Sequence, residues 1–77
     1  MAACVSVLPG MVSTYRWKRK VEKSCELLVL IKTSKTKWDA LQKFVLSRHP
    51  YELPELIAVP VVVGSKKYFS WVFQSTK

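Results

Sequence analysis

The side chains that could do chemistry in this sequence are few: two cysteines, one histidine and five carboxylates. Cys4 lies early in an apolar stretch, and His49 lies far away along the chain, directly before Pro50. A thiolate and an imidazole can act together in nucleophilic catalysis or in copper binding, but only where the fold brings them side by side. Nothing in their spacing predicts that, so we interpret Cys4 as a buried structural thiol.

The carboxylates have no spacing that forces two of them together for acid and base catalysis. They are Glu22, Glu26, Asp39, Glu52 and Glu55. The glycine-rich motifs that bind phosphates are also absent. We therefore expect no enzyme. His49 is the one candidate metal ligand, for copper or another divalent cation, although a histidine at a helix end is more often a cation favoured by the helix dipole.

Composition predicts one small domain over residues 1–77 with a subunit interface. The chain is 49% hydrophobic and carries three each of Trp, Tyr and Phe. A domain of this size buries only about 60% of the surface that its unfolded chain exposes. A hydrophobic fraction of 49% is more than so small a core can bury, and the surplus indicates association with other chains.

Charge suggests acidic partners and, as an alternative function, nucleic-acid binding. Thirteen Lys and Arg against five Asp and Glu give a formal charge of +8. The basic residues form short groups at expected turns, such as Lys18 to Lys20, and Trp17 stands beside this group as the candidate aromatic for stacking on bases. We interpret these groups as solvated loop ends and expect no nucleic-acid partner.

The two cysteines predict reduced thiols and a cytoplasmic location. If a turn at Lys18 to Lys20 joins two paired strands, the numbers of facing residues add up to about 38, and those of Cys4 and Cys25 fall well short of it. Two cysteines are too few for a disulfide framework, and no secretory leader is recognisable before Cys4. No apolar stretch is long enough to span a membrane.

Hydrophobic patterning predicts the order strand, strand, helix, strand, helix, which is an α+β layer sandwich. The first strand runs from residue 2 to 17 with a bulge or bend at Pro9-Gly10. The second lies within residues 21–33. Its apolar run from Leu27 to Ile31 does not alternate, which predicts a central strand that is covered on both faces.

The second half of the chain is predicted as helix, strand and helix. Thr36 and Asp39 match a capping box at the start of a helix from Lys37 to Arg48. Residues 56–63 match a strand at a sheet edge or with a bulge, because Pro60 cannot donate to a ladder. Residues 66–76 fit a strand or a helix, and we expect a short helix. Three strands and one long helix leave an open edge, which other copies of the chain are expected to close.

A family pattern runs through the chain from Ala2 to about Trp71. It comprises Ala2-Ala3-Cys4-Val5, Pro9, Ser13, Tyr15, Trp17, Lys20, Glu26, Lys32-Thr33, His49-Pro50-Tyr51, Pro54-Glu55, Pro60, Gly64, Tyr68 and Trp71. In this order and spacing the chain resembles the CutA family of divalent-cation-tolerance proteins, and the His-Pro-Tyr segment followed by Pro-Glu is the most specific part.

The resemblance implies a ferredoxin-like βαββαβ sandwich, similar to the PII signalling proteins and packed as a tight homotrimer. It implies a role in copper and other divalent metal ion tolerance, as a binding or scaffolding module that can have other proteins as partners. It also implies a cleft between subunits lined by Trp17, Glu26, Lys32, Tyr51, Glu55, Tyr68 and Trp71. Any Lys-Glu pair buried there would have to be mutually neutralised. The alternatives are that these residues only hold the trimer together, or that the cleft is an enzyme site.

This sequence departs from the family in two respects. Members normally begin with a strand and a helix before the Ala-Ala-Cys segment, so the first βα unit is expected to be absent from the 1–77 domain. The copper ligands suggested for bacterial members are a cysteine on that first strand and a His-His pair, of which only His49 has a counterpart, because Arg48 replaces the first histidine. Arg19 stands where the family usually has a turn glycine.

Overall fold

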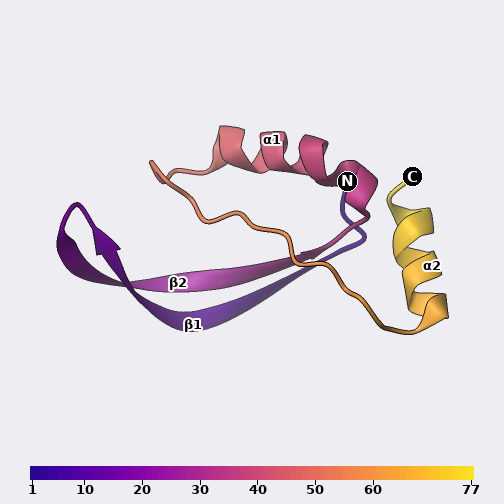
Figure 1. The fold of residues 1–77 in the computed structure, drawn as a ribbon, viewed down its shortest axis with the longest axis horizontal. Coiled ribbons are helices and arrows are strands. Elements are labelled where there is room, and N and C mark those ends of the chain that lie inside the picture. The colour runs from indigo at the N-terminus through magenta and orange to yellow at the C-terminus, as the bar shows by residue number, and fades with distance from the viewer.

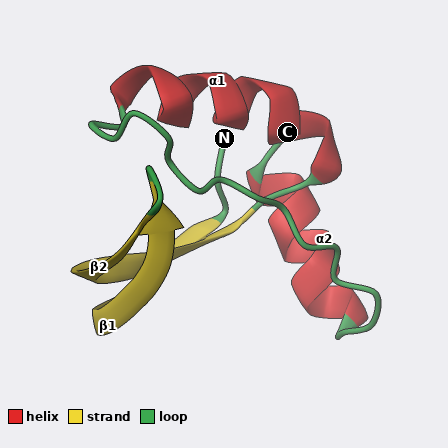
Figure 2. Cartoon of the chain, turned by 60° about the vertical axis from the view of Figure 1, so that its left-hand side comes forward, coloured by secondary structure: helices red, strands yellow, loops and turns green.

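The computed structural model describes residues 1–77 as a long hairpin with two helices. The elements are β1 (Cys4–Trp17), β2 (Lys20–Lys32), the 3-10 turn η1 (Lys35–Lys37), α1 (Trp38–Arg48) and α2 (Lys66–Ser75). Figure 1 shows the curved hairpin as one layer, α1 lying above it, and α2 standing at the end where both chain termini lie. The view in Figure 2 separates the yellow hairpin from the red helices. The predicted α+β class is confirmed.

The hairpin contains the expected bulge. β1 and β2 are antiparallel, with Cys4 opposite Lys32 at one end and Trp17 opposite Lys20 at the other, and the register shifts between Leu8 and Met11. Gly10 lies inside that shift at φ +79°, a conformation that costs a residue without a Cβ little. Two residues of β1, Pro9 and Gly10, stand against Leu27 alone on β2, and this one extra residue increases the local bend of the curved hairpin (Figure 1).

The ladder also keeps the two cysteines apart. Cys4 faces Lys32, whereas Cys25 faces Val12, and both thiols are free. The expectation that they do not pair is therefore confirmed.

The hairpin turn consists of Lys18 and Arg19, with φ angles of 48° and 68°. A two-residue turn of this kind matches the right-handed twist of the strands, but it strongly favours Asn and Gly because both positions are left-handed. Such a conformation costs a non-glycine residue roughly 1 kcal/mol. The turn is therefore tight and strained, not loose.

The start of α1 differs from the predicted capping box. The chain enters the helix through η1, in which the Lys37 N–H donates to the Ser34 carbonyl at 3.0 Å. Thr36 is inside this turn, so it cannot take the extended conformation of an N-cap, and its hydroxyl lies 3.2 Å from the Ser34 hydroxyl instead. No side chain caps α1, and the helix begins at Trp38.

The end of α1 is as predicted. Arg48 is the last helical residue, and His49 adopts an extended conformation (φ −77°, ψ 134°). This is the conformation that the following Pro50 requires, because the proline ring disfavours the helical one. The His49 N–H still donates to the Val45 carbonyl at 3.0 Å, so the imidazole is held at the end of the last turn.

The predicted strand over residues 56–63 is wrong as a sheet strand. The sheet has two strands, and the segment between α1 and α2 belongs to neither a strand nor a helix. Five backbone hydrogen bonds lie outside the helices and strands, and none involves residues 56–63. A strand exists only where a neighbour accepts and donates along it, and this segment runs below α1 without such a neighbour (Figure 1).

The predicted helix over residues 66–76 is confirmed as α2. The Ser65 hydroxyl caps it by accepting from the Tyr68 N–H at 3.4 Å. At its other end, the buried Thr76 hydroxyl lies 2.8 Å from the Ser34 hydroxyl and 2.8 Å from the Val72 carbonyl. The end of α2 is thereby attached to the loop that precedes α1.

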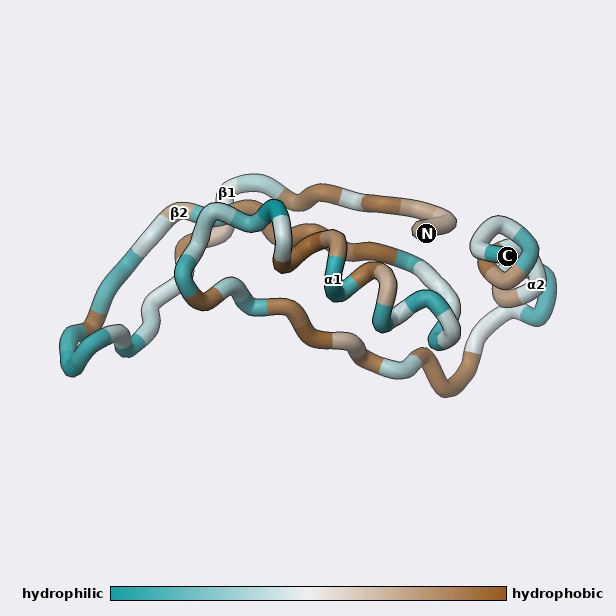
Figure 3. The backbone as a smooth tube through the Cα atoms, turned by 90° about the horizontal axis from the view of Figure 1, so that it is seen from above, coloured by the Kyte–Doolittle hydropathy of each residue, from teal (hydrophilic) through white to brown (hydrophobic).

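Very little of the chain is buried. Leu41 and Thr76 are the only buried residues, and Leu27 on β2 is 61% exposed. Within one chain β2 is not a central strand, because it pairs with β1 along one edge only, and the predicted cover of the Leu27 to Ile31 run on both faces does not hold, because Leu27 to Leu30 remain exposed. Figure 3 shows the apolar residues lying along the hairpin and along the 56–63 segment. The radius of gyration of 15.0 Å exceeds the roughly 11.5 Å of a compact domain of this length.

Candidate functional site

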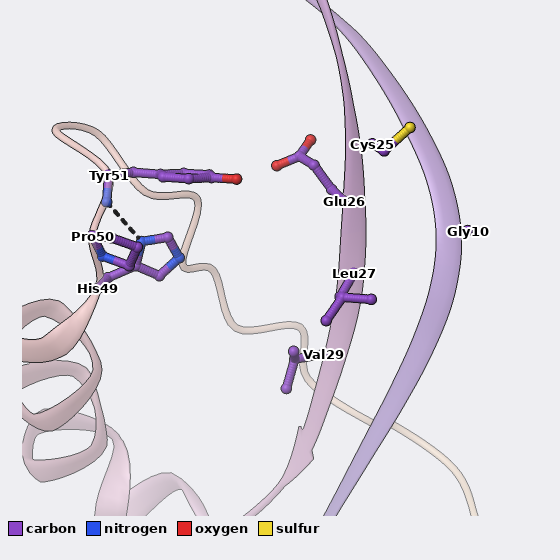
Figure 4. A pocket seen from close by; sticks show the side chains of 8 residues that line it. All are labelled: Gly10, Cys25, Glu26, Leu27, Val29, His49, Pro50 and Tyr51. Carbon is purple, nitrogen blue, oxygen red and sulfur yellow. Dashed lines mark hydrogen bonds between the residues drawn. The ribbon is translucent and has the colours of Figure 1, made fainter.

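A pocket of about 460 Å³ lies where the hairpin faces the end of α1. Gly10 lines it from β1, and His49, Pro50 and Tyr51 line it from the segment after α1. Four residues of β2 complete the lining: Cys25, Glu26, Leu27 and Val29. The pocket therefore brings together three of the residues predicted from sequence, which are Glu26, Tyr51 and His49 (Figure 4).

A local hydrogen bond fixes His49. The Tyr51 N–H donates to Nδ1 of His49 at 3.2 Å, and the two rings meet edge to face with centroids 4.7 Å apart and an interplanar angle of 67°. In a neutral imidazole only one nitrogen can accept, so this bond places the proton on Nε2. Metal coordination through either nitrogen would require a change of tautomer or the loss of this hydrogen bond.

Glu26 and Tyr51 face each other across the pocket. In Figure 4 the Glu26 carboxylate extends from β2 toward the Tyr51 hydroxyl, which comes from the opposite wall. The Cys25 thiol points the other way, toward β1, because neighbouring residues of a strand alternate between its faces. The open space is thus bordered by a carboxylate, a phenol and an imidazole. These groups suit hydrogen bonding to a small polar ligand or to a side chain of another protein.

One chain does not assemble a complete metal site from these residues. No three His, Cys, Asp or Glu side chains lie close enough together to hold a metal ion. A single imidazole whose Nδ1 is already engaged is a poor start for the three or four ligands that copper or zinc needs. The donor set of one chain does not fit such an ion.

Lys32 lies away from this pocket. It ends β2 six residues after Glu26, a spacing of about 20 Å along an extended strand. Its Nζ donates to the Ser6 hydroxyl at 2.7 Å, across the hairpin. Lys32 and Glu26 are therefore not partners within one chain.

Trp17 and Glu55 lie outside the pocket as well. Trp17 is at the hairpin tip, where Lys18 Nζ is 5.7 Å from its ring centroid. Lys18 also comes within 4.0 Å of Glu52, in an exposed ion pair of little energetic weight. Glu55 is exposed at the start of the segment that leads to α2.

Tyr68 and Trp71 form a pair on α2. Their ring centroids are 5.8 Å apart, and each residue is close to half exposed. The seven predicted cleft residues thus lie at five separate places on one chain, and only Glu26 and Tyr51 share the pocket. The inter-subunit cleft stays a prediction. Sequence reasoning missed Gly10 and Cys25 as pocket residues. The only signal for them was the expected bulge at Pro9-Gly10, because the bulge determines which residues of β1 and β2 lie opposite each other.

Neither helix has the length and apolar character needed to cross a membrane.

Comparison with known proteins identifies the class. Residues 1–75 match the family model of the CutA1 divalent ion tolerance protein. The solved divalent cation tolerance protein from Thermus thermophilus superposes with a TM-score of 0.94 at 39% identity, over 99% of this chain and 74% of that one. A PII-like protein CutA from Nostoc superposes with a TM-score of 0.92 at 31% identity, over 99% and 74% of the two chains.

The fold is therefore that of the PII-like α+β proteins. The chain belongs to the CutA1 divalent ion tolerance family. Protein CutA of Mus musculus is 47% identical over 77 residues, which are all of this chain and 44% of the mouse protein. The chain thus spans less than half the length of this curated relative.

Proposed function

We propose that residues 1–77 form a single CutA-like domain that acts as a homotrimeric binding or scaffolding module in the tolerance of divalent metal ions, including copper. In this proposal the domain is not an enzyme and works in the cytoplasm. The observation that carries the proposal is the large apolar surface that one chain leaves uncovered. Two buried residues in a chain that is 49% hydrophobic make too small a core for an independent domain.

Self-association is the simplest cover for this surface. Closed symmetric assemblies bury the same patch on every subunit and leave no open edge to recruit further copies. A strand edge on β2 and aromatic rings on α2 are both exposed in one chain, and contacts between these surfaces would place Tyr68 and Trp71 against a neighbouring hairpin. The residues predicted for the cleft would then come from two subunits.

The metal part of the proposal rests on family membership. Relatives such as the Thermus thermophilus protein are described by their divalent-cation tolerance. Because one chain does not supply a full ligand set, coordination would have to draw on several subunits, with His49 as the candidate ligand from this chain. His49 would exchange its hydrogen bond from Tyr51 for the metal.

Light scattering over a dilution series, with and without copper, tests the assembly. The expected result is a stable particle of about 27 kDa, three times the chain mass of 8.9 kDa. A monomer at all concentrations would contradict the proposed trimer.

Copper titration with a matched pair of variants tests the ligand. His49→Asn keeps an oxygen that can accept from the Tyr51 N–H, as in an Asx turn, but removes the imidazole. Arg48→Ala changes the neighbouring side chain and keeps the imidazole. Loss of specific copper binding in His49→Asn alone supports the ligand role, and equal binding by both variants and the parent chain contradicts it.

A further inference from the structure

The hairpin tip, residues 14–23, gathers basic side chains at the end of the hairpin opposite the chain termini (Figure 1). The tip holds five of the thirteen basic residues of the chain: Arg16, Lys18, Arg19, Lys20 and Lys23. All five are exposed. Because a strand rises about 3.4 Å per residue, these five charges lie within roughly 15 Å of one another along the ribbon.

The register of the hairpin sorts these charges between its two faces. Residues that lie directly opposite each other on antiparallel strands share a face, and neighbours along one strand point to opposite faces. Arg16 lies opposite Val21, and Lys23 follows two residues after Val21, so these three residues share one face. Glu22 is the only carboxylate of the tip, and it points to the other face. The face of Arg16, Val21 and Lys23, called the basic face below, therefore carries no negative charge of its own.

Little else in the chain neutralises the tip. The single ion pair of the structure joins Lys18 to Glu52 at 4.0 Å, between two exposed side chains. The other four basic residues of the tip have no acidic partner. A second copy of this chain is a poor cover for the tip, because each copy brings a net charge of +8. A surface of negative charge is the complementary partner.

The turn at the tip places two more cations where the backbone disfavours them. Lys18 and Arg19 both have positive φ angles, 48° and 68°, and Arg19 forms no ion pair that would hold it there. Asn and Gly would form the same turn without this cost. Backbone strain that brings no structural contact is more typical of a functional site than of a stabilising one.

Apolar side chains at the tip indicate a lipid surface as the anionic partner. Val21 is 67% exposed between the charges of the basic face, and Trp17 directly precedes the turn. An indole and an aliphatic side chain among Lys and Arg suit the bilayer interface, where cations meet lipid phosphates and apolar groups enter the layer beneath. Groups of four to eight Lys or Arg are typical of binding to anionic lipids. The phosphate backbone of a nucleic acid offers no such apolar layer to Val21.

We propose that the hairpin tip docks on a membrane surface that contains anionic lipids. Arg16, Lys23 and the turn residues Lys18 and Arg19 contact the headgroups, and Val21 enters the interfacial layer. This inference goes beyond the proposed metal function and does not depend on it.

Co-sedimentation of the intact chain with lipid vesicles tests the proposal. One set of vesicles is phosphatidylcholine alone, and the other contains about 30% phosphatidylserine. We expect the chain to bind the phosphatidylserine vesicles at least about tenfold more strongly than the neutral ones. Raising the salt from about 0.1 M to about 1 M should remove most of this binding, because the Debye length falls from about 10 Å to about 3 Å.

Two double variants with equal net charge locate the contact. Arg16→Gln with Lys23→Gln removes both cations of the basic face, whereas Lys66→Gln with Lys67→Gln removes two exposed cations at the start of α2. Each contact of a basic residue with an anionic surface is worth about fivefold in binding, so the first variant should bind about twentyfold more weakly. The second variant should bind within about twofold of the parent chain.

Arg19→Gly separates lost charge from lost fold. Glycine suits the left-handed conformation of residue 19, so this variant keeps the turn and removes one cation. We expect it to bind phosphatidylserine vesicles about fivefold more weakly than the parent chain.

Four results would overturn the proposal. Equal binding to neutral and anionic vesicles would exclude an electrostatic contact. Equal losses in the two double variants would mean attraction by net charge alone. Undiminished binding by Arg19→Gly would remove the turn from the contact. Binding of a DNA duplex without binding of phosphatidylserine vesicles would assign the basic face to nucleic acid.

Discussion

The backbone N–H of Tyr51 donates to Nδ1 of His49 across Pro50 at 3.2 Å. This bond lies directly after α1 and joins the same two residues whose rings meet edge to face. It aims the protonated Nε2, not a lone pair, away from the turn. In one chain His49 is therefore first a residue that orders the pocket wall and only second a candidate ligand.

Two substitutions of His49 separate the contribution of this hydrogen bond to stability from that of the ring contact. His49→Ala removes the acceptor and should lower the free energy of unfolding of the assembled protein by about 0.5–1 kcal/mol, the net worth of a partly exposed hydrogen bond. His49→Asn should retain most of that stability, because its carbonyl can accept from the Tyr51 N–H. Urea unfolding of the two variants beside the parent chain measures the difference. Equal loss in both variants would mean that the ring contacts, not the hydrogen bond, hold the turn.

The hairpin turn predicts a stabilising substitution. Arg19 has φ 68° and carries a side chain that this conformation disfavours, so Arg19→Gly should raise the free energy of unfolding by about 1 kcal/mol. Arg16→Gly is the control, since a glycine inside β1 should lower stability by a similar amount. Both are measured by urea unfolding. A destabilising Arg19→Gly would show that the turn is held by Arg19 side-chain contacts.

The contacts of the Thr76 hydroxyl predict that replacing this hydroxyl by a methyl group weakens the attachment of α2 to the loop before α1. Thr76→Val keeps the shape of this buried side chain but removes its contacts with the Ser34 hydroxyl and the Val72 carbonyl. We expect a loss of about 1 kcal/mol and greater solvent exposure of the Trp71 indole, seen as a red-shifted fluorescence. Ser75→Ala changes an exposed neighbour and should have no such effect. An unchanged spectrum in Thr76→Val would contradict the attachment of α2 through this contact.

The elements that local pattern specifies were predictable from the sequence. The end of α1 depends on Pro50, and the bulge depends on Pro9-Gly10. The spacing of aromatics over residues 66–76 fitted both a strand and the helix that forms, and the Ser65 cap of α2 emerged only from the structure. Each of these signals acts within a few residues. The predicted start of α1 was wrong, because a 3-10 turn and a capping box favour the same residue types, Ser, Thr and Asp. The loop that leads out of β2 adopts the 3-10 turn over Lys35–Lys37.

The features that need a distant partner were not predictable. Residues 56–63 have the composition of a strand, yet a strand is defined by the edge it pairs with, and no local signal places that edge. Likewise, the Leu27 to Ile31 run indicates cover on both faces without saying which chain provides it. At the site, His49 and Tyr51 were predicted from their sequence motif. Cys25 and Gly10 line the pocket because of the register between β1 and β2, which no local signal in the sequence gives.

Gly64 predicts a specific clash and its rescue. A Cβ added to Gly64 would lie 2.6 Å from Cζ of the Phe69 ring and 3.0 Å from its Cε1, so Gly64→Ala must displace that ring. Because the Phe69 side chain is only partly covered, the displacement should cost about 1–2 kcal/mol and not unfold the chain. Phe69→Leu shortens the side chain at the point of contact, so the double variant should lose less than the two single losses together. Urea unfolding of the four chains measures this coupling. Strictly additive losses would show that residue 64 and the Phe69 ring do not meet in solution, and that the entry into α2 takes another path.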